Sequence, residues 1–247
     1  MSTFPIKPFP LPEPPALDST RNLVILTGAG ISAESGLKTF RDAGGLWEGH
    51  RVEDVATPQA FIRQPDVVHS FYNARRHQLN EVEPNAAHTA LAELEHAWKG
   101  DFLLITQNVD NLHERAGSQN LLHMHGELAK ARCTHTKKVV DWTDEMTVDT
   151  ACPCCNKAGN LRPHIVWFGE VPLEMERIAE ALADCDYFMA IGTSGLVYPA
   201  AGFCYEAKAY GATTMELTLE PSGNPAFDCG LQGPASQTVP SLLQNLN

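Results

Sequence analysis

The sequence lacks a long apolar run, an excess of basic residues and a leader of the secretory kind. No apolar run approaches the roughly 20 residues of a membrane-spanning helix, so we expect no membrane contact. Lys and Arg number 18 against 30 Asp and Glu, and the net charge of −12 argues against direct nucleic-acid binding, which needs clustered cations. The opening MSTFPIKPFPLPEPP carries six prolines, so residues 1–19 are predicted to form a flexible, Pro-rich extension.

The cysteine count also excludes a simple disulfide scaffold. Seven cysteines is an odd number, and without an export signal they are expected to be reduced thiols and metal ligands in a cytoplasmic protein. With 43% hydrophobic and 19% charged residues over 247 positions, the chain has the composition of a globular protein with a substantial core.

Four short apolar segments predict buried parallel strands: LVILT (23–27), FLLITQ (102–107), YFMAIG (187–192) and TTMELTL (213–219). Helical patterns at 88–100 and 174–185 separate them, and Gly100 is expected to cap the first helix. Strands alternating with helices predict an α/β fold with a doubly wound, parallel, Rossmann-like sheet, whose ligands bind beyond the carboxyl ends of the strands.

Two stretches depart from this alternation and predict a smaller second lobe. Residues 42–85 contain helical pieces but no apparent strand, and residues 126–164 hold four cysteines within 23 positions. We therefore expect one catalytic domain over residues 20–247. Its Rossmann-like lobe comprises about 20–41, 86–125 and 165–247, with a helical insert at 42–85 and a zinc-ribbon insert at 126–164.

The glycine-rich loop after the first strand predicts a nucleotide site. Residues 28–33, GAGISA, match G-x-G-x-x-G/A in a strand–turn–helix context, and Gly30 is expected to let the backbone approach a pyrophosphate. A redox Rossmann domain should then show a second strand that ends in an Asp or Glu, which binds the ribose hydroxyl. The corresponding stretch, FRDAGGLWEGHRVED, contains acids but no apparent strand. A nicotinamide-dependent oxidoreductase therefore stays only as an alternative, beside a zinc-ribbon adaptor that binds without turnover.

Five motifs in order, GAGISAESGLKTFR, TQNVDNLHERAG, HMHGEL, VWFGE and GTSGLVYPA, give a specific resemblance. From about residue 20 to its end the chain resembles the sirtuins, NAD-dependent protein-lysine deacylases. FYNARR supplies a Tyr-x-x-Arg pair, Tyr72 and Arg75, as in the bacterial CobB-type, class III members. In that class the pair binds acidic acyl groups such as succinyl and malonyl.

The resemblance implies a reaction and its catalytic residues. NAD is consumed as a co-substrate, acetyl and also succinyl or malonyl groups are removed from the lysine, and nicotinamide and O-acyl-ADP-ribose are released. The family motif selects His125, directly before Gly-Glu-Leu, as the general base, whereas the composition leaves His123 an equal competitor. Asn108 is the second catalytic residue. Transfer of ADP-ribose to another nucleophile stays open as a side activity.

The resemblance also assigns binding residues. Those expected to contact NAD are Gly28, Ala29, Gly30, Ala33, Phe40, Arg41, Trp47, Gln107, Asn108, Val109, Asp110, Gly192, Thr193, Ser194, Thr218, Leu219, Glu220 and Ala235. Those expected to contact the acyl-lysine substrate are Tyr72, Arg75, Ala56, Val166, Phe168, Gly169 and Val197, with the peptide added between residues 166–170 and 195–199. Arg76 should point elsewhere, and the protein is expected to be a monomer.

One structural zinc ion is expected in the cysteine-containing insert. Sirtuins typically hold it with two Cys-x-x-Cys pairs, and here Cys152 and Cys155 form one pair. Cys133 stands alone in the other half, because Thr136 occupies the position of the second cysteine. The ligand set is therefore predicted to be Cys133, Cys152 and Cys155, with His135 or Cys154 as the fourth.

Overall fold

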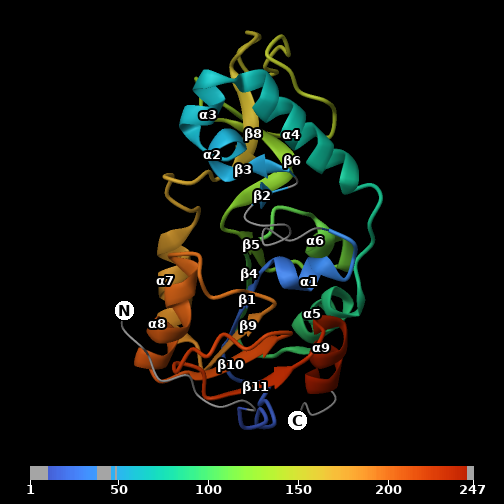
Figure 1. The fold of residues 1–247 in the computed structure, drawn as a ribbon. Helices are drawn as coiled ribbons and strands as arrows, with labels where there is room; N and C mark the ends of the chain where they lie inside the picture. Colours follow the sequence, from blue (N-terminus) through green and yellow to red (C-terminus); the bar gives the residue numbers. More distant parts are fainter. Residues whose placement is uncertain (1–10, 38–45, 48, 244–247) are drawn as a thin grey trace, which may run out of the picture.

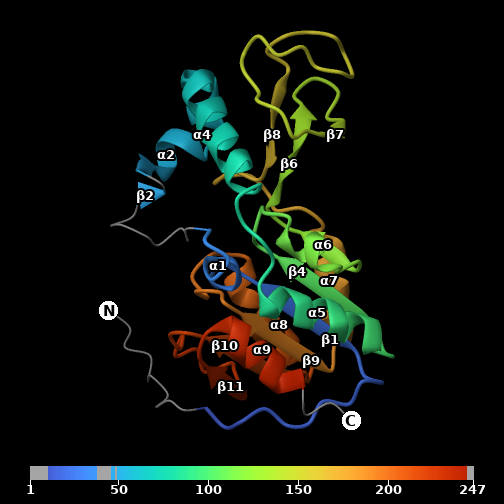
Figure 2. The same cartoon turned by 90° about the vertical axis from the view of Figure 1, so that its right-hand side faces the viewer.

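The computed structural model describes residues 11–37, 46–47 and 49–243. Of the predicted NAD residues, Phe40 and Arg41 lie outside this part, and of Trp47 only the backbone is described. The chain forms two lobes, a large one around a six-stranded sheet and a smaller one beyond the carboxyl ends of its strands (Figures 1 and 2).

The large lobe is built on an all-parallel sheet, as predicted. Its strands, from edge to edge, are β11 (Cys229–Gln232), β10 (Thr213–Thr218), β9 (Tyr187–Ile191), β1 (Leu23–Thr27), β4 (Phe102–Thr106) and β5 (Leu121–His123). The strand order reverses at β1, which pairs with β4 on one side and β9 on the other. This switch point is where doubly wound sheets bind their ligands. The four predicted strands are confirmed, and β5 and β11 are added at the edges.

Helices cover both faces of the sheet (Figure 2). Apolar side chains of α5 (Ala86–Ala97) and α9 (Ala235–Leu243) form one core with the sheet, and those of α7 (Met175–Asp184) and α8 (Phe203–Ala209) form the other. The expected cap of α5 at Gly100 is wrong, because the helix already ends at Trp98. A Cβ at Gly100 would lie 2.3 Å from the carbonyl oxygen of Arg21, so close backbone packing accounts for this glycine.

The smaller lobe combines a helical and a β part. The helical part has α2 (Val52–Val55), α3 (Pro58–Arg63) and α4 (Pro65–Gln78), preceded by a short antiparallel pair, β2 (Leu46–Trp47) and β3 (His50–Arg51). The expectation of an insert without strands was therefore wrong at this pair. The β part is an antiparallel sheet of β6 (Gly126–Cys133), β7 (Val139–Asp141) and β8 (Leu161–Ile165). Arg76 of α4 donates from Nε to the carbonyl of Leu128 in β6 at 2.9 Å, and so joins the two parts.

Three short helices complete the chain: α1 (Ala29–Ala33), α6 (Leu112–Ala116) and the 3-10 helix η1 (Ala200–Gly202). Residues 11–19 lie against the large lobe: Leu17 is buried in its core, and the carbonyl of Pro12 accepts from the backbone N–H of Gly230 at 3.0 Å. This half of the expected extension thus belongs to the folded body. Within the described residues, we find no helix with the length and apolar character needed to cross a bilayer.

Candidate active site

The glycine loop after β1 packs directly on the loop after β9. The N–H of Gly28 donates to the carbonyl of Ile191 at 3.0 Å, and that of Gly30 donates to the carbonyl of Gly192 at 2.8 Å. A Cβ at Gly30 would lie 2.7 Å from the Gly192 carbonyl oxygen, and one at Gly192, whose φ is +59°, would lie 2.5 Å from the amide nitrogen of Ile31. The contact between the two loops therefore requires glycine at position 30, and its approach to a pyrophosphate stays a prediction.

Polar side chains join the carboxyl ends of the central strands. Asn108 donates from Nδ2 to the carbonyl of Gly28 and to Oγ of Ser32, both at 3.1 Å. Ser32 Oγ in turn donates to Asp110 at 3.0 Å, and Gln107 donates from Nε2 to Oγ1 of Thr193 at 2.9 Å. Asn108, Ser32 and Asp110 thus form one hydrogen-bonded set, and Gln107 and Thr193 form another, both at the carboxyl ends of the central strands.

Burial shapes the charge of this network. Asp110 is 7% exposed, and the loss of solvation raises the pKa of its carboxyl group. Hydrogen bonds from the Leu112 N–H and from Ser32 oppose that rise by favouring the ionised form. The Asp110 carboxylate therefore has a fixed orientation beside Asn108.

His125 lies beside the Gln107 backbone, between β5 and β6. Its Nδ1 lies 3.0 Å from the carbonyl oxygen of Gln107, and since a carbonyl only accepts, Nδ1 carries the proton. Nε2 of the neutral ring then has the lone pair, and among the described residues it has no hydrogen-bond partner. Burial lowers the pKa of His125, whereas the hydrogen bond with the Gln107 carbonyl acts to raise it, and the net shift is downward. The ring is therefore neutral at neutral pH, as a general base must be.

His123 has the opposite hydrogen-bond pattern. Nδ1 lies 3.1 Å from the carbonyl oxygen of Asn108, and Nε2 lies 2.8 Å from a carboxylate oxygen of Glu114. Burial lowers the pKa of His123, but the hydrogen bond and charge of Glu114 outweigh it, so the net shift is upward. An imidazole that donates from both nitrogens cannot accept a proton. The hydrogen-bond geometry therefore favours His125 over His123, between which the composition alone does not decide.

The smaller lobe carries Tyr72 and Arg75 on α4. Tyr72 is fully buried, and its hydroxyl accepts from the indole N–H of Trp167 at 2.9 Å. Arg75 lines a groove of about 490 Å³ together with His50, Asp66, Val67, Ser70, Phe71, Ala74 and Gln78. Burial raises the pKa of the Tyr72 phenol, and the charge of Arg75 acts to lower it. Tyr72 itself is not among the residues that line the groove. Arg76 points to the ribbon, as expected.

The segment predicted to hold substrate peptide connects this lobe to His125. The N–H of Val166 donates to the carbonyl of His125 at 2.8 Å, and that of Phe168 donates to the carbonyl of Ala56 at 3.0 Å. Phe168 is half exposed and Gly169 has a φ of +91°. Backbone hydrogen bonds thus connect Val166 with His125 and Phe168 with Ala56, while their role toward a substrate stays a prediction. Val197 lies apart, in the loop after β9 between exposed Leu196 and Tyr198.

The remaining predicted NAD residues lie around the carboxyl ends of the sheet. Ala29 and Ala33 bound α1, and Val109 packs partly buried against the apolar core of the smaller lobe. Ser194 follows β9, where its Oγ accepts from the Leu196 N–H at 3.3 Å. Thr218 ends β10 and donates from Oγ1 to the carbonyl of Glu220, next to exposed Leu219, and Ala235 begins α9. All are placed near strand ends, in the region where the switch-point rule puts a ligand.

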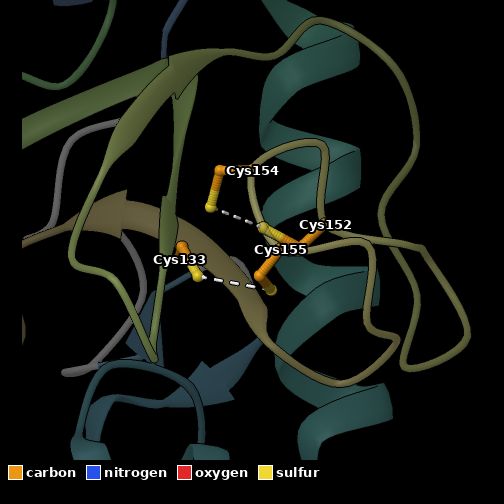
Figure 3. A group of neighbouring side chains, drawn as sticks. All are labelled: Cys133, Cys152, Cys154 and Cys155. Carbon is orange, nitrogen blue, oxygen red and sulfur yellow. Dashed lines mark hydrogen bonds between the residues drawn. The ribbon is translucent and has the colours of Figure 1, made fainter.

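Four cysteines converge in the β part of the smaller lobe (Figure 3). The sulfur atoms of Cys133, Cys152, Cys154 and Cys155 all lie within 4.8 Å of one another, with Cys133 and Cys155 at 3.8 Å and Cys152 and Cys154 at 3.3 Å. A tetrahedral zinc ion with Zn–S bonds of about 2.3 Å separates its sulfurs by about 3.8 Å. The four thiols therefore fit structural zinc, and Cys154, one of two candidates left open, completes the set.

Sequence reasoning missed several residues that build this site. Ser32 connects Asn108 to Asp110 from within the glycine loop, where it was treated as a spacer. Glu114 accepts a hydrogen bond from His123, and its position soon after the TQNVDN segment could have indicated an acid near the site. Trp167 forms a hydrogen bond with Tyr72, 95 positions away in the sequence, and no local sequence pattern predicts such a pair.

Comparisons with known proteins agree with this geometry. The Sir2 family matches residues 28–199. A protein of Escherichia coli (strain K12) named "NAD-dependent protein deacylase" is 60% identical over 94% of this chain and 84% of its own. A solved Sir2 homolog–NAD complex has a TM-score of 0.81 at 38% identity, covering 90% of this chain and 88% of that one. A Sir2 protein bound to a myristoylated histone peptide has a TM-score of 0.70 at 32% identity, covering 91% and 90%. The chain belongs to the Sir2 family.

Proposed function

We propose that this chain removes acyl groups from protein lysines at the expense of NAD, with release of nicotinamide and O-acyl-ADP-ribose. One observation carries the proposal: a neutral histidine presents an unprotonated Nε2 at the edge of a nucleotide-type switch point. His125 is held in that tautomer by the Gln107 carbonyl at 3.0 Å. The name of the Escherichia coli relative and the NAD complex of a structural neighbour support the same reaction.

Each group of site residues has its own role in the proposed reaction. The network of Gln107, Asn108 and Asp110 orients NAD, whose ribose supplies the electrophilic carbon for the acyl oxygen. His125 Nε2 then accepts the proton of a ribose hydroxyl, which becomes the nucleophile toward the acyl carbon. The apolar core beneath Val109, Ala56 and Trp167 forms a dry boundary on the side of the smaller lobe.

The acyl group enters between the helical insert and the segment 166–170. Arg75 presents a guanidinium at a groove, and a guanidinium binds a carboxylate with two parallel hydrogen bonds. Tyr72, one helical turn before it, adds a hydroxyl. We therefore extend the activity from acetyl to succinyl and malonyl groups. The peptide backbone adds between 166–170 and 195–199, which demands little of its sequence.

The proposal also covers the zinc site, the cellular compartment and the oligomeric state. The four cysteines would hold one zinc ion, which would stabilise the ribbon and take no part in the chemistry. None of the seven cysteines forms a disulfide, which suits a reducing compartment, the cytoplasm. The net charge of −12 suits proteins that present basic, lysine-bearing segments. All the predicted site residues come from one chain, so we take the protein to act as a monomer.

A panel of peptides tests the proposal. Acetyl-, succinyl- and malonyl-lysine versions of one peptide are incubated with NAD, and nicotinamide is followed beside NADH absorbance. We expect nicotinamide with at least one peptide, no NADH, and loss of turnover in His125→Ala. Reduction of NAD without nicotinamide release would support an oxidoreductase instead, and binding without turnover would support an adaptor.

A further inference from the structure

His113 is a buried histidine of α6 that no step of the proposed reaction uses. The residue is 1% exposed, and its Nε2 lies 3.0 Å from Oγ1 of Thr27, the last residue of β1. Thr27 Oγ1 lies 2.9 Å from Oγ1 of Thr106, the last residue of β4. Thr106 Oγ1 in turn accepts from the backbone N–H of Asn108 at 3.0 Å. One chain of hydrogen bonds thus connects a buried histidine to a predicted catalytic residue.

The proton positions in this chain follow from the burial of its members. Burial lowers the pKa of His113 well below the ordinary 6.5, so the ring is neutral and carries a single N–H. Nδ1 of His113 has no hydrogen-bond partner within the described part of the chain, and buried N–H groups are rarely left without an acceptor. The proton is therefore on Nε2, which donates to Thr27, and Thr27 donates onward to Thr106.

The far end of the chain holds the backbone of Asn108, whose other polar groups are held as well. Its carbonyl oxygen lies 3.1 Å from Nδ1 of His123, and its Nδ2 donates to the carbonyl of Gly28 and to Oγ of Ser32. These contacts leave the amide oxygen, Oδ1, as the polar atom of Asn108 that has no hydrogen bond to the described residues. A ligand at the switch point can therefore donate to Oδ1.

We propose that His113 is a positioning residue for the proposed reaction: by donating to Thr27 it orients two threonine hydroxyls, and these fix Asn108 with Oδ1 toward NAD. A hydroxyl rotates about its C–O bond, so the direction of its lone pairs depends on the donors around it. A group that is oriented before its ligand binds avoids the cost of being ordered on binding. This inference rests on the proposed function, because it assigns Asn108 to NAD.

Packing holds the donor at the start of the chain in place. The ring of His113 lies against that of His88 in α5, with a centroid distance of 4.9 Å and an interplanar angle of 59°. The carbonyl of His113 accepts from the backbone N–H of Ser118 at 3.0 Å. The imidazole N–H therefore keeps its direction toward Thr27, whereas a water molecule in its place could rotate.

Replacement of His113 by Gln and by Met gives a matched test. Both side chains have the reach of His113 Nε2, but Gln places an N–H donor there and Met a methyl group. We measure kcat/KM for NAD with an acetyl-lysine peptide, and the KM for that peptide. His113→Met should lower kcat/KM for NAD about two- to tenfold, the value of one neutral hydrogen bond, and His113→Gln should stay within about twofold of the wild type. The KM for the peptide should not change, because Asn108 acts on NAD.

Thr27→Val tests the route, because valine keeps the shape of the threonine and lacks its hydroxyl. The loss should equal that of His113→Met, and the two substitutions together should cause no further loss. Equal losses in His113→Gln and His113→Met, additive losses, or an unchanged rate in His113→Met would overturn the inference and leave the wild-type activity, and so the proposed function, intact. A wild type that deacylates no peptide would instead overturn the proposed function, and this inference with it.

A measurement on the wild type keeps the test independent of how well the variants fold. Long-range proton–nitrogen NMR correlations distinguish the two tautomers of a neutral imidazole, and His113→Gln identifies the His113 signals among those of the ten histidines. We expect His113 as a neutral ring with its proton on Nε2 at neutral pH. A proton on Nδ1, or on both nitrogens, would overturn the inference, because Nε2 of His113 would then not be the fixed neutral donor to Thr27.

Discussion

Replacing Arg75 by Met removes a guanidinium that lines the groove and keeps a long apolar stem in its place. The side chain is 7% exposed, so solvent screens its contact with a bound carboxylate only weakly. A charge-assisted contact contributes about 1.5–3 kcal/mol, which corresponds to about 10- to 150-fold in kcat/KM. We expect this loss on succinyl- and malonyl-lysine peptides, and acetyl-lysine turnover close to that of the wild type.

The same substitution has a cost in stability that is separable from specificity. The Arg75 guanidinium carbon lies 4.7 Å from the centroid of the Phe71 ring, a cation–π contact of about 0.5–2 kcal/mol. Arg75→Met should therefore lower the Tm, as measured by thermal unfolding. Arg75→Lys is the matched control: it keeps the charge but not the fork, so its succinyl loss should be intermediate. Equal losses on all three acyl groups would refute the assignment of Arg75 to the acyl carboxylate.

Three further predictions concern protonation and metal. Because burial lowers the pKa of His125, kcat/KM should stay constant as the pH falls below 6.5, the ordinary pKa of histidine, and should decrease only at lower pH. A decrease centred above pH 6.5 would contradict this. Glu114 raises the pKa of His123. The ion pair of the two residues therefore stabilises the folded protein below pH 6.5, and this contribution is lost as the pH rises through the raised pKa. Glu114→Gln should thus lower Tm more at about pH 6 than at about pH 9, and a pH-independent difference would argue against the pair. Cys154→Ser should lower both bound zinc, measured by elemental analysis, and Tm, more than Cys229→Ser does; retained zinc would remove Cys154 from the site.

The sheet could be predicted because its strands are locally distinctive. LVILT and YFMAI are short apolar runs with every residue buried, and burial on both faces is what such composition indicates. Strand β5 has only three residues, and β11, CGLQ, contains a glycine, so neither is apolar enough to stand out. Pairing with β4 and β10 forms them, and that is a tertiary effect.

The site was predictable in its members but not in its connections. His125 and Asn108 could be proposed from motifs, yet the tautomer of His125 depends on a carbonyl 18 positions away. For Gly30 the sequence could not show a second requirement, the close contact with Gly192 in a distant loop. Cys154 was one of two alternatives, and only the folded ribbon brings its sulfur to the other three. Long-range contacts of this kind leave no local pattern.

The most direct test of the central claim is the stoichiometry of a single reaction. The wild type is mixed with NAD and an acetyl-lysine peptide, and nicotinamide, free lysine peptide and O-acetyl-ADP-ribose are quantified together by mass spectrometry. An NAD-consuming deacylase with His125 as its base predicts equal amounts of all three, and none of the free peptide in His125→Ala. Free peptide formed without nicotinamide, or at an undiminished rate in His125→Ala, would contradict it.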